Sequence, residues 1–526
     1  MMNTISLLSA LPFDCLSLWR NSTYGWFRGG LGAVLFLVQQ LFVSPVQAQE
    51  TFAPSLAPRS LTLTEAIVLA RKQSVDAAYA LGQLKSAYWS YRTFRAQLLP
   101  EVSFTATLPG YRKNYNIYQQ SDGSHTYVRN DYMNLNGELS LDQRIWLTGG
   151  SLSLTTSLDF MTQFSSHPTQ RQYLSVPIAL TLNQPLFGVN TVKWDRRIEP
   201  VRYAEAQARF LSATEEVTMS VIQYYFNLLL SRENVNIARQ NLQNAEKLYQ
   251  VAETKRSMGK ISENDLLQLR LNVLNARSTL TASESTRQSD MFALRSFLAL
   301  PDTEELVPQL PDTVPPLALR YGEVLEKALA NHSFSHNLRR RGLEADYQVA
   351  KAKGNRRNIA LFAQVGFTGT SDHIGPAYAE MKDNQVVELG VRLPLLDWGK
   401  RRGQVKVAES NREVVHQQLR KEKADFTQRL FVLTEQFNNQ VSQLHIAGEA
   451  DAIARKRYQA QVETFLLGKI STLDLNDAEK SKDEARRKYI NELFSYWYYY
   501  YQIRSLTLWD FARQTNIDAD FEKIVR

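Results

Sequence analysis

Apolar and polar residues alternate with a period of two in four stretches between about residues 101 and 184. The clearest stretch carries Leu174, Val176, Ile178, Leu180 and Leu182 on one parity. Two more such stretches lie between about residues 359 and 395. This period predicts strands with one apolar face and one polar face. The connecting residues 110–132 and 162–171 are rich in polar side chains and are predicted to be long loops.

A helical pattern follows each set of strands. After the first set, it predicts a long helix over about 190–257 and a return helix over about 263–299. The second half repeats the plan with a helix over about 399–467 and a return to about residue 509. Each long helix would measure roughly 100 Å at about 1.5 Å per residue. The seam residues of the first one are Ala238, Leu242, Ala245 and Ala252.

Short helices are predicted before each set of strands. One opens at Leu63, with Thr64 as its cap, and is stopped by Pro100. Two more are expected over 321–331 and from His336 to about residue 356.

A short motif at the helical turns occurs twice, 209 residues apart. The two copies are Gly259-Lys260-Ile261-Ser262 followed by Asp265-Leu266, and Gly468-Lys469-Ile470-Ser471 followed by Asp474-Leu475. Equal spacing of this kind indicates an internal duplication. The predicted organisation is a signal peptide over 1–48, a first repeat over 49–300, a Pro-rich linker over 301–320, a second repeat over 321–510 and a loosely held tail over 511–526.

The first residues resemble a secretory signal. Arg20 and Arg28 precede a short apolar run, and Ala48 is a small residue at the expected cleavage position. A signal-anchor helix is the alternative, although the apolar run is short for spanning a bilayer. The single cysteine, Cys15, would leave with the signal, so no disulfide or thiolate metal site is expected. Asp14 stands before Cys15 where a lipid-attachment cysteine would need a small residue, so no acyl anchor is expected either.

Composition narrows the class of protein further. A net charge of +8 over 526 residues is a mild excess of interspersed charges, so nucleic acid is not an expected partner. No stretch of about 18 apolar residues follows residue 48, so no transmembrane helix is predicted. Alternating strands in an exported chain instead predict a β-barrel crossing an outer membrane. Because six strands cannot close a wide barrel, several chains would have to share it.

The order and equal spacing of these features resemble the TolC-like outer-membrane efflux proteins over about residues 61–510. The matching motifs are Leu63-Thr64-Glu65-Ala66, the junctions Pro185-Leu186 and Pro394-Leu395, the two Gly turns, and the ending Leu506-Thr507-Leu508-Trp509-Asp510-Phe511. The resemblance implies an α+β membrane protein in which the duplicated repeat of strands and a long helical hairpin builds a homotrimer. That trimer would join an outer-membrane β-barrel to a long periplasmic α-helical barrel.

The resemblance also implies a function. The trimer would be a passive export duct of a tripartite efflux system, carrying small molecules from an inner-membrane pump and a periplasmic adaptor to the outside. A type I protein-secretion duct of the same architecture remains an alternative, as does a soluble periplasmic coiled-coil scaffold or adaptor. The family pattern has two strands in each half, whereas the first half here predicts four. The extra hairpin either enlarges the barrel or sits outside its wall.

Matched residue by residue, Asp474 and Asp477 fall where the family places acidic rings at the periplasmic entrance, and Asp265 is the equivalent in the first copy. Carboxylate rings in a narrow pore favour cations. The alternative is that these residues are solvated acids or helix-start residues favoured by the helix dipole. The family's basic locking residue would stand at Ile470, but the basic residue here is Lys469.

The turn motifs are candidate adaptor-docking tips: Gly259, Lys260, Ile261 and Ser262, and Gly468, Lys469, Ile470 and Ser471. Glycine suits the helix end, and the serines can cap the returning helices. The aromatic run Tyr496 to Tyr501 is predicted to pack in a core rather than to form a membrane belt. No His-Glu-x-x-His, P-loop or Gly-x-Ser-x-Gly motif occurs, so the chain is not expected to be an enzyme or to hold a metal or cofactor.

Overall fold

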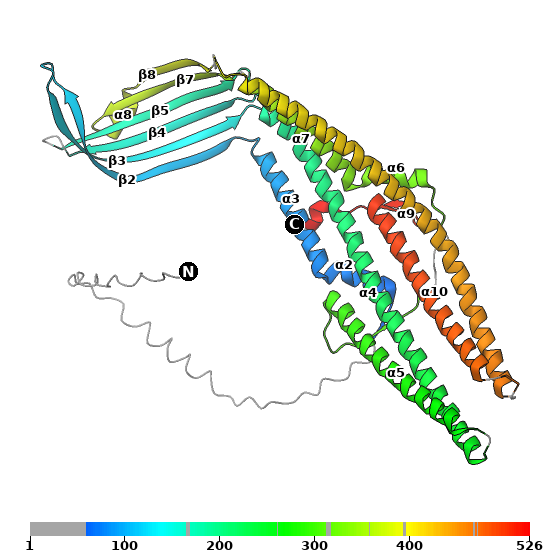
Figure 1. Cartoon of the computed structure of the whole chain (residues 1–526). Coiled ribbons are helices and arrows are strands. Elements are labelled where there is room, and N and C mark those ends of the chain that lie inside the picture. Colours follow the sequence, from blue (N-terminus) through cyan, green and yellow to red (C-terminus); the bar gives the residue numbers. More distant parts are fainter. Residues whose placement is uncertain are drawn as a thin grey trace, which may run out of the picture. The chain divides into compact units, whose positions relative to one another are not determined.

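In the computed structural model, six strands pair in one antiparallel sheet among the described residues, in the order β2-β3-β4-β5-β7-β8 (Figure 1). They are β2 (Glu101–Gln119), β3 (His125–Arg144), β4 (Ser151–Gln163), β5 (Gln170–Pro185), β7 (Asn358–Ser371) and β8 (Lys382–Arg392). The prediction of six alternating strands is confirmed, and the extra hairpin of the first half lies within the sheet. The structure describes residues 59–164, 169–259, 261–311, 317–356, 358–392, 396–466, 469–470 and 472–525. The predicted signal peptide lies outside these ranges.

The register sorts side chains onto two chemically different faces. One row across five strands is apolar and consists of Val102, Leu141, Leu154, Leu180 and Val365. The neighbouring row on the other face is polar and consists of Glu101, Asp142, Ser153, Thr181 and Gln364. The five apolar side chains are between 36% and 66% exposed. The described chain therefore leaves its apolar sheet face uncovered, which is typical of a wall that faces lipid.

The prediction of a loop over 110–132 is wrong. Residues 110–119 pair with residues 125–134 as the outer part of β2 and β3, and only a tight turn with Gly123 at a φ of 84° separates the strands. Among the described residues, no third strand pairs with the outer part of this β2–β3 hairpin, because β4 ends at Gln163 opposite Tyr132. Both faces are then open to solvent, so polar and aromatic residues occur on each and the alternation disappears. The loop predicted over 162–171 is likewise shorter, since β4 and β5 take both of its ends.

Two helical hairpins carry most of the remaining chain. The first consists of α4 (Thr191–Ser257) and α5 (Glu263–Phe297), and the second of α9 (Lys400–Leu466) and α10 (Thr472–Thr507). Both α4 and α9 have 67 residues, which corresponds to roughly 100 Å. β5 leads into α4 and β8 leads towards α9, so the sheet lies at one end of these helices and the hairpin turns lie at the other (Figure 1).

In the described part of the chain, four shorter helices pack beside the long ones, namely α2 (Leu63–Gln73), α3 (Val75–Ala96), α6 (Tyr321–Asn331) and α7 (Ser333–Gly354). The short helix α8 (Ile374–Ala379) lies against β5 and β7 of the sheet, and α11 (Phe521–Val525) lies against α3. The cap of α2 is Thr62 rather than the predicted Thr64. Thr62 and Glu65 bond reciprocally at 3.0 and 3.3 Å, a capping box that needs its acidic partner three residues on. Thr64 has no such partner at the matching position, because residue 67 is Ile67.

The main core lies where α2, α6 and the two hairpins meet. Tyr225, Phe437 and Tyr496 are fully buried there, and the rings of Phe437 and Tyr496 lie 5.3 Å apart. Tyr500 and Tyr501 are buried in the same cluster. The prediction that this aromatic run packs in a core is therefore confirmed.

Two small strand pairs lie beside this core, one near the first described residues and one near the last. β1 (Arg59–Leu61) pairs in parallel with β6 (Leu306–Pro308), and β9 (Trp509–Asp510) pairs with β10 (Thr515–Asn516). The tail was predicted to be loosely held, and this is wrong for its described part. Phe511 is only 2% exposed, and the short helix α11 packs against α3. A few apolar residues fix a segment that is polar in average composition.

Candidate functional site

The turn between α4 and α5 depends on a left-handed glycine. α4 ends at Ser257, and Gly259 follows with a φ of 72°. A residue with a Cβ is strained at this angle, which explains why glycine ends the helix. The Arg256 guanidinium donates a hydrogen bond to the Ile261 carbonyl at 3.3 Å, so the turn is fastened to its helix. Lys260 lies outside the described residues.

Ser262 and Asp265 form a reciprocal cap at the start of α5. The Asp265 amide donates to the Ser262 hydroxyl at 3.1 Å, and the Ser262 amide donates to the Asp265 carboxylate at 3.3 Å. The hydrogen bond from the Ser262 hydroxyl lowers the pKa of Asp265, so this exposed carboxylate is ionised at neutral pH. Capping is therefore an observed role of Asp265, and a role in an acidic ring stays a prediction.

The second turn connects Leu466, the last residue of α9, with Thr472, the first of α10. Gly468 and Ser471 lie outside the described residues, so the glycine turn and serine cap expected there remain predictions. Between them, Lys469 is exposed and its amide donates to the Thr464 carbonyl at 3.2 Å. Ile470 is partly buried.

The structure places Asp474 and Asp477 in the first two turns of α10, where both are exposed. Their spacing of three residues puts them on one helix face. Arg457 of α9 forms an ion pair with Asp477 at 3.1 Å, with side chains 50% and 65% exposed. Sequence reasoning missed this arginine. The sequence position of this arginine could have revealed it. Arg457 precedes Gly468 by eleven residues and Asp477 follows Gly468 by nine, so the two residues face each other across the hairpin.

A polar seam joins the two hairpins along α4 and α10. Asn244 of α4 donates to Glu479 of α10 at 2.6 Å, and the Tyr458 hydroxyl of α9 lies 3.5 Å from the same carboxylate oxygen. Burial raises the pKa of Glu479 above its ordinary value. Asn241 donates to Asp483 at 3.2 Å one turn further on. These buried or partly buried amides and carboxylates were also missed, because the sequence alone does not show which helix faces are opposed.

The seam continues towards the sheet with arginines of α10. Arg487 donates to Asn234 at 2.9 Å, and Arg486 pairs with Glu233 at 2.9 Å. Arg486 also lies 3.4 Å from Asp451 of α9, a carboxylate that is almost fully buried. α10 thus forms hydrogen bonds and ion pairs with α4 of the first hairpin and also an ion pair with α9 of its own hairpin. Any sliding of one hairpin past the other must break these bonds.

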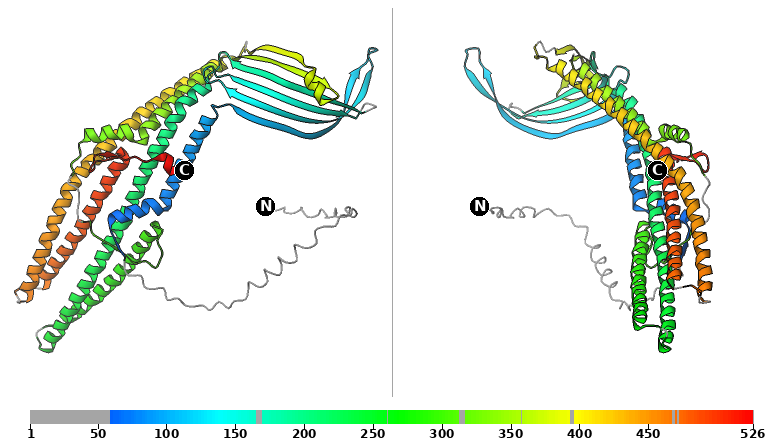
Figure 2. Two further views of the ribbon diagram at one scale, coloured as in Figure 1. Left: turned by 180° about the vertical axis from the view of Figure 1, so that it is seen from behind. Right: turned by 45° about the vertical axis from the view of Figure 1, so that its right-hand side comes forward.

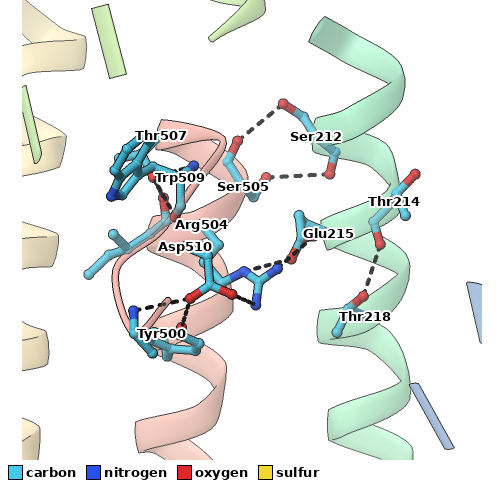
Figure 3. A network of polar contacts seen from close by, with 12 residues as sticks. Ser212, Thr214, Glu215, Thr218, Tyr500, Arg504, Ser505, Thr507, Trp509 and Asp510 are labelled. Atoms are coloured by element: carbon cyan, nitrogen blue, oxygen red, sulfur yellow. Dashed lines mark hydrogen bonds and ion pairs between the residues drawn. The ribbon is translucent and has the colours of Figure 1, made fainter. Parts of the chain in front are cut away.

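A buried charge network holds the other end of α10 (Figure 3). Arg504 lies between the carboxylates of Glu215 of α4 and Asp510 of β9, at 3.4 and 3.1 Å. Tyr500 donates to Asp510 at 2.7 Å, and Arg71 of α2 pairs with Glu215 at 2.7 Å. Glu215 has no solvent exposure, so its charge depends on these two guanidinium groups. The network fixes this end of α10 to α4, α2 and the C-terminal strand.

No group of three or more His, Cys, Asp or Glu residues that could hold a metal ion occurs in the part of the chain that the structure describes.

None of the described helices has the length and apolar content needed to span a bilayer.

Known proteins share both the sequence pattern and the fold. The sequence model of the outer membrane efflux protein family matches residues 151–300 and 339–496, more than half of the chain. The cobalt-zinc-cadmium resistance protein CzcC of Cupriavidus metallidurans is 23% identical over 293 residues. That alignment covers 55% of this chain and 66% of CzcC, slightly less than two thirds of the relative's length.

Solved structures show the same fold at low sequence identity. The CmeC outer membrane channel of Campylobacter jejuni is 16% identical, with a TM-score of 0.61 over 88% of both chains. The open state of the MtrE outer membrane channel of Neisseria gonorrhoeae is 14% identical, with a TM-score of 0.56 over 87% of this chain and 91% of MtrE. The chain belongs to the outer membrane efflux protein family, and is located in the outer membrane with its helical part in the periplasm.

Proposed function

We propose that the chain is a passive export duct that works as a homotrimer in a tripartite efflux system. Small molecules pass from an inner-membrane pump, through a periplasmic adaptor, into the helical part and then out through the sheet. The observation that carries this proposal is the sheet with one uncovered apolar face and one polar face, joined directly to helices of 67 residues. The apolar face suits lipid, the polar face suits a water-filled lumen, and the helices span a wide periplasmic distance.

The acidic residues of α10 are proposed to form the periplasmic gate. Under threefold symmetry, Asp474 and Asp477 give two stacked rings of carboxylates, which attract cations and oppose anions. Asp265 adds a third negative group at the first turn, held ionised by its cap.

Planar-bilayer conductance of the purified chain tests the duct and the gate together. The native protein is expected to give a small, cation-preferring current, and Asp474→Ala with Asp477→Ala is expected to raise the current and reduce the preference. Asp302→Ala is a matched control, since this acid lies in the loop after α5 near the main core and far from the turns. The same conductance and selectivity in the double variant would remove the gate, and no current from any form would remove the duct.

The two turns are proposed as the surfaces that contact the adaptor. Ile261 and Ile470 are apolar residues placed at turns between charged or polar neighbours, and threefold symmetry would repeat each turn three times. Ile261→Asp with Ile470→Asp is expected to abolish adaptor binding and export while trimers still form. Val414→Asp is the control, because Val414 is an exposed apolar residue of α9 that lies far along the helix from the turn. Normal export by the double variant would contradict the docking role.

A further inference from the structure

The two edge strands of the sheet each have an open side. Within the described residues, β2 pairs only with β3, and β8 pairs only with β7. Figure 2 shows these two edges on opposite sides of one curved sheet, β2 in blue and β8 in yellow. An open edge presents a row of unpaired N–H and C=O groups. In hydrocarbon such groups have no water to bond, so a sheet that faces lipid must close its edges.

The directions of the two edge strands allow them to pair with a second copy of this chain. The six strands alternate in direction across the sheet, so β2 and β8 run in opposite directions. β8 of one copy and β2 of the next can therefore pair antiparallel, as every other neighbouring pair does. Both edge strands also reach the helical end of the sheet. β2 begins there, just after α3, and β8 ends there, shortly before α9.

The structure of β2 limits this pairing to its first part. Residues Glu101–Thr107 form an uninterrupted edge, and an irregularity between Thr107 and Gly110 then breaks the register. Pro109 lies at that break and offers no N–H to a neighbour. A bulge with proline is a device that ends edge pairing. The open edge thus coincides with the part of β2 that carries the alternating apolar residues Val102, Phe104 and Ala106.

The family match supplies an independent observation. It begins at Ser151, the first residue of β4, so β2 and β3 lie outside it. Yet β3 pairs with β4 along thirteen residue pairs, from Tyr132 opposite Gln163 to Arg144 opposite Ser151. The two strands outside the match are therefore part of the wall and not an appendage beside it.

We propose that β2 of one copy pairs with β8 of the next, so that three copies close a wall of eighteen strands. The number of copies rests on the trimer of the proposed function, and the strand count rests on the sheet. At a strand spacing of about 4.8 Å and a tilt of about 40°, eighteen strands give a diameter of roughly 36 Å between strand axes. Twelve strands, from β4, β5, β7 and β8 alone, would give roughly 24 Å. The additional hairpin widens the exit of the duct by half.

Disulfide formation between copies tests the pairing in the full-length chain with Cys15 replaced by serine. One cysteine replaces Val386 of β8, which the register places in the same polar row as Glu101. The second cysteine is moved through alternate positions of β2, namely Glu101, Ser103, Thr105 and Thr107. We expect covalent dimers and trimers on non-reducing gels, with the yield highest at one β2 position and lower two residues away. Each single-cysteine variant is the control and should stay uncrosslinked.

A wall of twelve strands, the alternative, would give a different crosslink. If β2 and β3 lay outside a twelve-strand wall, β8 would meet β4 of the next copy, and Val386→Cys would link to Ser153→Cys or Thr155→Cys. Trimers that link through β4, or that link at no β2 position, would overturn the eighteen-strand wall and leave the duct intact. A chain that is monomeric by mass in detergent and links at neither strand would overturn the proposed function itself. Links at β2 but not at β4 support the inference.

Discussion

Asn244 of α4 and Glu479 of α10 meet at 2.6 Å across the boundary between the two helical hairpins. Both side chains are partly buried, and the Asn244 amide also lies 3.3 Å from the Tyr458 hydroxyl of α9. This contact therefore ties three of the four long helices together at one point. An opening motion that separates the hairpins has to break it.

The first prediction concerns the strength of this contact. Asn244→Ala removes a hydrogen bond to a partly buried carboxyl group and is expected to cost about 1–3 kcal/mol in the free energy that separates the hairpins. Hydrogen exchange of the α10 amides should speed up accordingly near Glu479. Asn272→Ala, which removes an amide from α5 rather than from the contact, is the control. Equal exchange rates in the two variants would show that the Asn244 contact does not hold the hairpins.

The second prediction concerns pH. Because burial raises the pKa of Glu479 in the folded chain, the protonated form is favoured there. The protonated Glu479 side chain contributes its full stability below pH 4.5, the pKa of this group in the unfolded chain. This contribution is lost as the pH rises through the higher pKa of the folded chain. The protection of the α10 amides from hydrogen exchange, corrected for the intrinsic increase of exchange with pH, is expected to fall over this rise, and Glu479→Gln should flatten that fall. Glu484→Gln, an exposed acid on the same helix, should leave it unchanged. A pH profile in Glu479→Gln that matches the native one would contradict this assignment.

The third prediction concerns Arg457, the cation beside the acidic residues of α10. Arg457→Ala removes a positive charge 3.1 Å from Asp477 and is expected to increase cation preference in bilayer recordings. Because the pair is exposed, unfolding free energy should change by less than about 1 kcal/mol. Arg277→Ala is the matched control, since it breaks an exposed pair with Glu246 on the first hairpin. Selectivity that moves equally in both variants would show a general charge effect and no role for Arg457.

The fourth prediction concerns the buried network in Figure 3. Arg504→Met leaves Arg71 as the one charged partner of Glu215 among the described residues, and is expected to destabilise the fold by about 3–5 kcal/mol. Thermal unfolding should show a large fall in the midpoint. Arg239→Met, which breaks an exposed pair with Glu284, should shift it little. Adding Glu215→Gln should restore part of the loss, because Glu215 then carries no buried charge, although Asp510 still lacks its guanidinium partner.

Local patterns were enough to predict much of this structure. Strands such as the one carrying Leu180 and Leu182 were predictable because one face is apolar and the other is polar. The turn at Gly259 and the cap between Ser262 and Asp265 were predictable because their interactions reach no further than a few residues. The ribbon over 110–132 escaped the same reasoning because neither of its faces is buried, so no alternation marks it.

Long-range contacts could not be predicted in this way. Asn244 and Glu479 are 235 residues apart, and Glu215 and Arg504 are separated by 289. Their pairing depends on how the two hairpins are turned towards each other, which is set by packing of the whole core. The sequence shows polar residues in these helices but gives no sign of which ones become buried partners.

The last prediction concerns a partly buried histidine at the start of α7. His332 accepts a hydrogen bond from the Phe334 amide at 3.1 Å and stacks on the ring of Phe426, at a centroid distance of 5.5 Å. Burial lowers the pKa of His332 from 6.5 to about 4, so the folded chain keeps the imidazole neutral. Its contribution to stability is complete above pH 6.5 and is lost as pH falls towards 4, because the unfolded chain takes up the proton first.

The free energy lost over this range is about 3 kcal/mol, at about 1.4 kcal/mol for each pKa unit. Denaturant unfolding at pH 7 and pH 4.5 should therefore show a smaller difference for His332→Asn, which keeps a capping acceptor and does not titrate. His445→Asn, which removes an exposed histidine of α9, should behave like the native chain. An acid-induced loss that is as large in His332→Asn as in the native protein would assign the effect to other groups.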